Sequence, residues 1–181
     1  MQVFLIAAIT LDGFIAQHTD QPSTKWTSQE DKDHFHKKTQ QAGVIVMGKT
    51  TFDTIGFALP QRLNIIYTTE SREELASRMN LDQNQLRDEV LRTTVLDPKD
   101  LISQLTQEGF EQVAICGGSS IYTQFMQAKL VDKLFLTVEP IIFGNGIKLF
   151  NQPINQKLSL ISSKQLNEKG TLLLEYDCES K

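Results

Sequence analysis

Two glycine turns in this chain have the residue types and spacing to hold an anionic ligand. Gly48-Lys49-Thr50-Thr51 follows the apolar run 44–47, and Gly117-Gly118-Ser119-Ser120 follows the run 112–116. Glycine lets backbone N–H groups approach a ligand closely, and a helix that starts there presents its positive end. Two such turns in one small sheet favour a ligand with several anionic groups, such as a dinucleotide. The alternative is that both glycines only permit tight turns.

The first turn also matches the phosphate-loop pattern G-x-x-x-x-G-K-[ST], from Gly43 to Thr50. That motif works only where the residues between the two glycines form a loop whose N–H groups wrap a phosphate. Here those residues are Val, Ile, Val and Met, which predict a buried strand. We therefore do not expect a phosphate-loop nucleotidase.

A polar helix, expected from Gln29 to Gln41, carries the candidate acid Asp31. The preceding Thr27-Ser28-Gln29-Glu30 has the form of a capping box. Asp31, Phe35 and Thr39 fall at i, i+4 and i+8, so they share one face on which a carboxylate beside a ring can line a ligand cleft. The alternative is that Asp31 is an ordinary first-turn carboxylate, favoured by the helix dipole.

The histidines and cysteines predict neither a metal site nor a disulfide scaffold. His34 and His36 are two residues apart and face different sides of the helix, so we expect both to be exposed to solvent. Cys116 and Cys178 are too few for a scaffold and fit no zinc spacing, which favours reduced thiols.

The elements that must position these residues alternate between strand and helix over the first two thirds of the chain. Strands are expected at residues 3–9, 44–47, 63–67, 93–96, 112–116, 133–139, 159–165 and 172–177. Helices are expected at 29–41, 50–55, 71–87 with a break near 80–82, 97–108 and 119–128. Continuous apolar runs indicate strands covered on both faces. The pattern predicts an α/β fold in one domain of residues 1–181, parallel in the middle, with antiparallel C-terminal strands at an edge.

The composition excludes several classes of protein. Hydrophobic residues make up 40% and charged residues 22%, which is typical of a globular protein rather than a disordered one. The net charge of -4 argues against nucleic-acid binding as the main task. No apolar run approaches the length of a membrane span, and residues 3–9 fit a buried strand better than a signal peptide. We expect a cytoplasmic protein with a small-molecule ligand.

The chain resembles dihydrofolate reductases along almost its whole length. The segments that carry the resemblance are 5–9, Trp26, Asp31, Phe35, 47–52, 55–56, 59–66, 116–122 and 136–137. The resemblance implies the dihydrofolate-reductase-like fold, a three-layer αβα arrangement around a mostly parallel eight-stranded sheet. It also implies NADPH as the cofactor.

Two further motifs resemble the reductase domain of the riboflavin-biosynthesis protein RibD and its stand-alone relatives. They are Leu11-Asp12-Gly13-Phe14-Ile15-Ala16, and Leu136 to Pro140 followed by Gly144 to Phe150. Typical dihydrofolate reductases lack the second motif. This branch implies reduction of 5-amino-6-(5-phosphoribosylamino)uracil in riboflavin biosynthesis, and no deaminase segment with zinc ligands is present. The segment Glu139–Phe150 contributes to dimers in related proteins, so we expect a homodimer.

The resemblance also implies a set of cofactor-binding residues. Those expected at the pyrophosphate are Gly117, Gly118, Ser119, Ser120 and Ile121 on one side and Gly48, Lys49, Thr50 and Thr51 on the other. Lys49, with Thr68 and Thr69, is expected to bind the 2′-phosphate and to favour NADPH over NADH. The residues expected at the nicotinamide are Ala7, Ala8, Ile15 and Tyr122.

The substrate positions leave three functions open. Asp31 and Thr137 match the pair that binds the pteridine ring in folate reductases, with Phe35 beside it, and Arg62 matches the arginine that grips the folate carboxylate. RibD-like proteins can also carry an acid at the position of Asp31, and Arg62 can equally grip a phosphate or form a surface salt bridge. We favour RibD-type reduction, with dihydrofolate reduction as the alternative. A relative that binds NADPH without turnover is the third possibility.

Overall fold

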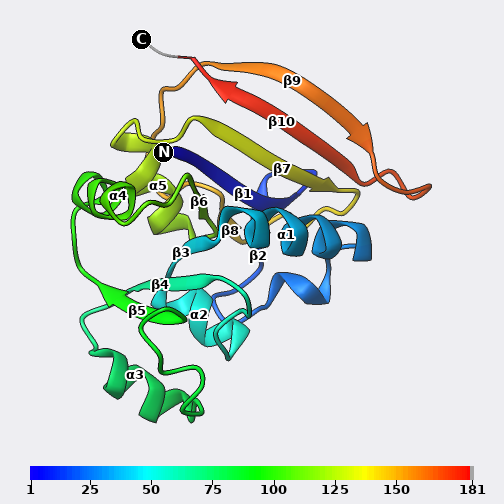
Figure 1. The fold of residues 1–181 in the computed structure, drawn as a ribbon. Helices are drawn as coiled ribbons and strands as arrows, with labels where there is room; N and C mark the ends of the chain where they lie inside the picture. The colour runs from blue at the N-terminus through cyan, green and yellow to red at the C-terminus, as the bar shows by residue number, and fades with distance from the viewer. Residues whose placement is uncertain (180–181) are drawn as a thin grey trace.

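The structure, a computed structural model that describes residues 1–179, is built on an eight-stranded sheet (Figure 1). The sheet has the order β5-β4-β3-β6-β1-β7-β10-β9. The strands are β1 (Gln2–Thr10), β3 (Val44–Gly48), β4 (Leu63–Tyr67), β5 (Leu91–Thr94), β6 (Gln112–Ile115), β7 (Lys133–Glu139), β9 (Leu158–Gln165) and β10 (Leu172–Cys178). Neighbours from β5 to β7 pair in parallel, whereas β10 and β9 are antiparallel. The predicted fold class is confirmed.

Five helices among the described residues cover the two faces of this sheet. They are α1 (Gln29–Ala42), α2 (Lys49–Ile55), α3 (Arg72–Met79), α4 (Pro98–Gln107) and α5 (Ser119–Gln127). Residues of α4 and α5 share one buried core with Val3 and Leu5, while residues of α1, α2 and α3 share a second core with Phe4 and Ile6. Alternate side chains of β1 thus enter opposite cores, which is why its sequence is continuously apolar. None of these helices is long and apolar enough to cross a membrane.

The ends of α1 place Asp31 in the helix. The N-cap is Ser28 rather than Thr27, because the Ser28 hydroxyl accepts a hydrogen bond from the Asp31 amide at 3.3 Å. The sequence predicts the start of the capping box at Thr27, which is one residue before the observed N-cap. Gly43 ends the helix with a left-handed φ of 73°, as its position predicts. Asp31 is consequently the third residue of the first turn.

The segment between β4 and α4 differs most from the expectation. Helix α3 stops at Met79, with Asn80 left-handed, and residues 80–90 form turns instead of a second helical stretch. Strand β5 starts and ends two residues earlier than expected. Its anchor is the fully buried Leu91, whereas Val95 and Leu96 are exposed and give no apolar contact to hold a strand.

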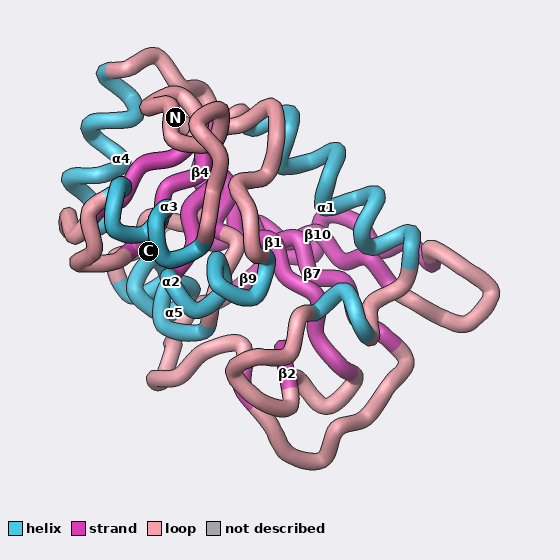
Figure 2. The backbone as a smooth tube through the Cα atoms, turned by 90° about the horizontal axis from the view of Figure 1, so that it is seen from below, coloured by secondary structure: helices cyan, strands magenta, loops and turns pink. Residues whose placement is uncertain are grey.

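A second, two-stranded sheet was not expected from the sequence. Antiparallel β2 (Phe14–Ala16) and β8 (Ile147–Lys148) lie among the loops, apart from the main sheet (Figure 2). Asp12 connects the same two segments, because its carboxylate accepts hydrogen bonds from the Phe143 amide at 3.2 Å and the Gly144 amide at 2.7 Å. The two motifs that resemble RibD therefore form one structural unit.

We expect Asp12→Ala to release the 143–148 segment. The substitution removes the acceptor of both amides and of the Thr10 hydroxyl. Amide hydrogen exchange at Gly144 should then accelerate about tenfold or more. The Thr10 hydroxyl foremost lowers the pKa of Asp12, so the contact is present above the unfolded-state pKa and is lost as pH falls through the folded-state value.

Asp20→Ala is the matched control, because the side-chain partner of this exposed carboxylate within residues 1–179 is His18 alone. Exchange at Gly144 should stay unchanged in it. Equal exchange at Gly144 in the wild type and in Asp12→Ala would show that the β2–β8 pairing alone holds the segment.

Candidate active site

The two glycine turns lie side by side at one edge of the sheet. Gly48 ends β3 and Gly117 follows β6, and because these strands are parallel neighbours their carboxyl ends meet. The Gly48 amide donates a hydrogen bond to the Gly117 carbonyl oxygen at 2.7 Å. The structure thus brings together the two turns that the sequence singled out, at the edge where ligands of such sheets bind.

A Cβ at any of the three turn glycines would lie close to a neighbouring side chain. Gly117 has a φ of +118°, and a Cβ there would lie 3.2 Å from the Tyr122 hydroxyl. A Cβ on Gly118 would lie 3.2 Å from Thr51 Oγ1, and one on Gly48 would lie 3.2 Å from Ile121 Cγ1. The Gly117–Gly118 peptide bond is cis. Backbone atoms rather than side chains therefore form the surface of both turns.

Each turn leads directly into a helix. Lys49, Thr50 and Thr51 form the first turn of α2, and residues 119–121 form the first turn of α5. Neither helix has a side-chain cap, so their first N–H groups have no such partner. The Ser119 hydroxyl is buried and has no hydrogen-bond partner among the described residues. These donors fit the anionic oxygens of a dinucleotide.

The Tyr122 side chain packs against the second glycine turn. It is 4% exposed, and its hydroxyl donates to the Ile6 carbonyl oxygen at 2.8 Å. Burial raises its pKa, as do the nearby charges of Cys116 and Asp31. The side chain is therefore a neutral phenol that ties α5 to β1 beneath Gly117.

The residues expected at the nicotinamide come from β1 and β2. Ala7 and Ala8 lie toward the carboxyl end of β1, opposite Leu136 and Thr137 of β7. Ile15 packs against the same core cluster as Ala7. The register of β1 and β6 places the two alanines beside the Gly117 turn.

Asp31 and Thr137 are both buried at this edge. Asp31 is 9% exposed, and burial raises its pKa. The hydroxyls of Thr137 and Thr27 act in the opposite direction, and the charge of Glu139 raises the pKa further. The pKa of the Asp31 carboxyl therefore lies above that of an exposed aspartate, chiefly because the group is buried.

Glu139 is a buried carboxylate that the sequence reasoning missed. One oxygen accepts from the Ser28 amide and the other from the Thr171 hydroxyl, each at 2.7 Å. Because Ser28 is the N-cap of α1, Glu139 fixes the turn that carries Asp31. The available signal was the strand alternation, which places Thr137 and Glu139 on the same face of β7.

Arg62 lies at the other end of the α1 face. Its guanidinium donates to the Pro60 carbonyl oxygen at 2.9 Å and to the Thr39 hydroxyl. Arg62 is 4% exposed and forms no ion pair with a described residue. The alternative that it forms a surface salt bridge is therefore wrong. Its Nη2 has no hydrogen-bond partner there. Asp31, half-buried Phe35 and Thr39 share one face, as predicted.

The exposure expected for the α1 histidines is correct only for His36. His34 is half-buried, with its Nε2 enclosed and without a partner among residues 1–179. Its ring lies 6.0 Å from that of Phe135, because this side of α1 covers β7. Burial lowers the pKa of His34, so the ring is neutral at physiological pH.

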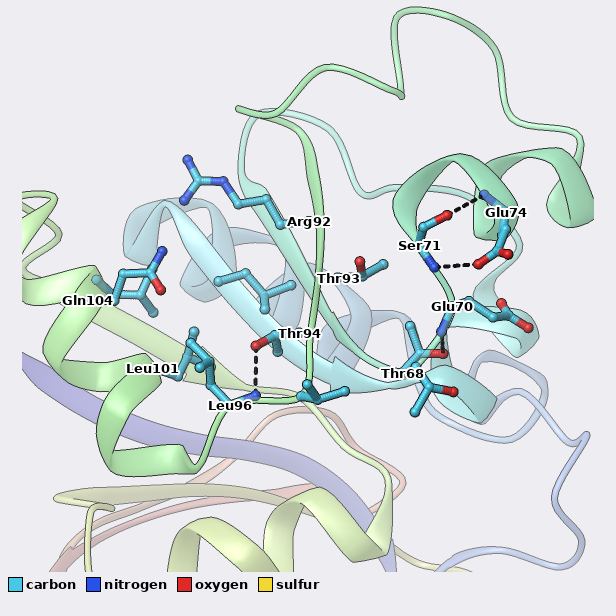
Figure 3. Close-up of a pocket in the computed structure, with 14 residues that line it drawn as sticks. Thr68, Glu70, Ser71, Glu74, Arg92, Thr93, Thr94, Leu96, Leu101 and Gln104 are labelled. Carbon is cyan, nitrogen blue, oxygen red and sulfur yellow. Dashed lines mark hydrogen bonds between the residues drawn. The ribbon is translucent and has the colours of Figure 1, made fainter.

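A cavity of about 500 Å³ lies beyond the carboxyl ends of β4 and β5 (Figure 3). Thr68, Thr69 and Glu70 line one side of it, and residues 94–96 line the other. Lys49 does not point a free ammonium group at this region. Its Nζ lies 3.4 Å from an Asp53 oxygen and 3.5 Å from a Glu70 oxygen.

The chain matches known proteins over nearly its full length. Residues 1–172 match the model of the RibD C-terminal domain family. The uncharacterised protein YwjB of Bacillus subtilis is 24% identical, over 91% of each chain. The dihydrofolate reductase of the same organism is 27% identical, over 90% of this chain and 83% of that one.

Solved structures share the fold. A putative riboflavin biosynthesis protein from Shewanella sp. PV-4 has a TM-score of 0.79 at 19% identity, over 99% of this chain and 100% of that one. RibD of Acinetobacter baumannii has a TM-score of 0.80 at 18% identity, over 99% of this chain and 58% of that one. The chain therefore belongs to the RibD C-terminal domain family, a family of oxidoreductases with the dihydrofolate-reductase-like fold.

Proposed function

We propose that the chain is an NADPH-dependent reductase that acts on a phosphoribosylamino-pyrimidine. The observation that carries this proposal is the hydrogen-bonded pair of glycine turns beside the buried acid Asp31 at one sheet edge. The reaction adds a hydride to the ribosyl carbon and a proton to the departing ring oxygen, which gives the ribityl form. Family membership and the riboflavin-related structural neighbours support this substrate class.

The fit to a dinucleotide rests on the free donors of the two turns. Gly48 and Gly117 leave their backbones open, and the first N–H groups of α2 and α5 bind the pyrophosphate. The Ser119 hydroxyl gains an acceptor there. Ala7 and Ala8 leave space for the nicotinamide. When bound, NADPH supplies a hydride from C4 of its dihydronicotinamide ring.

Asp31 is the residue that holds the proton. Its burial favours the protonated carboxyl, which can donate to the substrate, while Thr137 binds beside it. Glu139 holds the first turn of α1 and so orients Asp31. Arg62, whose Nη2 lacks a partner among the described residues, would bind the substrate phosphate at the far end of the α1 face.

Dihydrofolate reduction is the second candidate. It is favoured by the same Asp31, Thr137 and Arg62 arrangement and by relatives named dihydrofolate reductase. In that case Asp31 assists protonation of a pterin C=N bond and Arg62 grips a carboxylate. Saturable NADPH binding without consumption of either substrate would favour a non-catalytic relative.

We expect the protein to oxidise NADPH with the phosphoribosylamino-pyrimidine and not with dihydrofolate. Asp31→Asn should slow hydride transfer about a hundredfold or more, because it removes the proton donor. The wild-type rate should fall as pH rises through the raised pKa of Asp31, since the ionised form cannot donate. Single-turnover absorbance at each pH measures both effects.

Glu139→Gln serves as the comparison variant for that pH profile. It keeps an acceptor for the Ser28 amide but removes a charge that raises the pKa of Asp31. The midpoint should move to lower pH without the loss seen in Asp31→Asn. A flat wild-type profile, or turnover with dihydrofolate alone, would contradict the proposed reaction.

We expect Gly118→Ala to weaken NADPH binding about tenfold or more while the protein still folds. Gly118 has a φ of -78°, which alanine adopts without strain, and its Cβ meets only Thr51 Oγ1. The added methyl group fills the surface where the pyrophosphate lies. Titration calorimetry measures affinity, and the thermal midpoint reports folding. Unchanged affinity would show that the turn is not the cofactor site.

We also propose that the protein is a homodimer and that β9 forms its interface. All eight residues of β9 are exposed, and β9 is an edge strand of the sheet. Leu158, Leu160 and Ile161 are exposed on it, and Lys164 is its only charged residue. An exposed edge strand with three large apolar residues and one charge can pair with an identical strand.

We expect Ile161→Lys to convert the dimer to a monomer. A buried ammonium group at the interface is unfavourable, and charge on an edge strand opposes pairing. Light scattering after size exclusion measures the mass. Ile142→Lys is the control, because Ile142 is also an exposed apolar residue but lies in the 139–150 segment. Dissociation by Ile142→Lys alone would place the interface there instead.

A further inference from the structure

Four charged side chains form a cluster that includes Glu70, a residue lining the cavity shown in Figure 3. Lys49 contacts both Asp53 and Glu70. Arg78 contacts the same two carboxylates, at 2.8 Å from Asp53 and 3.0 Å from Glu70. Two cations and two anions leave the cluster with no net charge, so Lys49 is not a free cation.

Glu70 is held in this cluster by the backbone. Its amide donates to the Thr68 hydroxyl at 3.1 Å, and α3 begins just after it at the Ser71 cap. Arg78, in the last turn of α3, reaches back and bonds both Glu70 oxygens through its Nε. Figure 3 shows the Glu70 side chain on the Thr68 side of the cavity, away from Leu96 and Leu101.

A purely basic site favours a ribose with a 2′-phosphate over a ribose with a free 2′-hydroxyl. This cluster of mixed charge acts differently on the two. A 2′-phosphate beside Lys49 brings its charge close to two carboxylates, which repel it. A free 2′-hydroxyl can instead donate a hydrogen bond to a carboxylate oxygen, and acidic residues accept such a bond in NAD sites. The attraction from Lys49 and Arg78 and the repulsion from Glu70 and Asp53 therefore oppose each other.

We propose that Glu70 sets the cofactor preference of this chain, cancelling the pull of Lys49 on a 2′-phosphate so that the site binds NADH as well as NADPH. The inference rests on the proposed dinucleotide site and adds a determinant on the loop between β4 and α3. The carboxylate lies within a cluster that also contains Asp53, so the same substitution at either acid should act in the same direction.

Calorimetric titration with NADP⁺ and NAD⁺ tests the proposal, because these ligands differ only in the 2′-phosphate and do not turn over alone. The two wild-type dissociation constants should lie within about tenfold of each other. Glu70→Gln should shift their ratio toward NADP⁺ by about tenfold, the size of one partly screened charge interaction. Lys49→Ala should shift it toward NAD⁺.

Glu73→Gln is the matched control, because Glu73 lies on α3, is exposed, and contacts Arg72 rather than the cluster. Its ratio should equal the wild-type ratio. Asp53→Asn provides a second variant if Glu70→Gln does not fold. An unchanged ratio in the folded Glu70 or Asp53 variant would overturn the inference while leaving the cofactor proposal intact. Failure of the wild type to bind either dinucleotide would overturn both.

Discussion

The hydrogen bond from the Gly48 amide to the Gly117 carbonyl oxygen is the contact on which the candidate site depends. It joins the ends of two parallel strands and so sets the starts of α2 and α5 side by side. Each turn alone is a common way for a chain to leave a strand. Together they place two helix starts without side-chain caps next to each other, which fits the two phosphate groups of the proposed cofactor.

A second contact connects this edge to the chemistry. Glu139 ends β7, and its carboxylate holds both the N-cap of α1 and the Thr171 hydroxyl at the start of β10. Asp31 lies three residues after that cap. Its position is therefore fixed by β7, a strand that is distant from α1 in the sequence. The same carboxylate raises the pKa of Asp31. One buried neighbour thus positions the acid and adds to the effect of burial, which is the main cause of its raised pKa.

The sequence predicts the local features of the site and misses the contacts between residues that are distant in the sequence. Apolar runs identify the strands, and the spacing of Asp31, Phe35 and Thr39 identifies one helix face, because both periods are local properties of the backbone. The bond from Ser28 to Glu139 spans 111 residues, and the contacts of Asp12 with the 143–144 amides span more than 130. No periodicity encodes such pairs, so Glu139 and the β2–β8 sheet were missed. Lys49 was assigned from its own motif without Glu70, which the fold brings to it.

The substrate is a different kind of problem, because the side chains that would recognise it are chemically ambiguous. Asp31 and Thr39 are eight residues apart, which is about 12 Å along α1. Arg62 is bonded to Thr39, so acid and guanidinium lie at opposite ends of that length. A pterin with a distant carboxylate and a pyrimidine with a distant phosphate both offer a ring for one end and an anion for the other. The guanidinium fork accepts either anion. Discrimination between the two substrates must therefore come from the residues that lie between Asp31 and Arg62. Half-buried Phe35 is the residue that α1 contributes there.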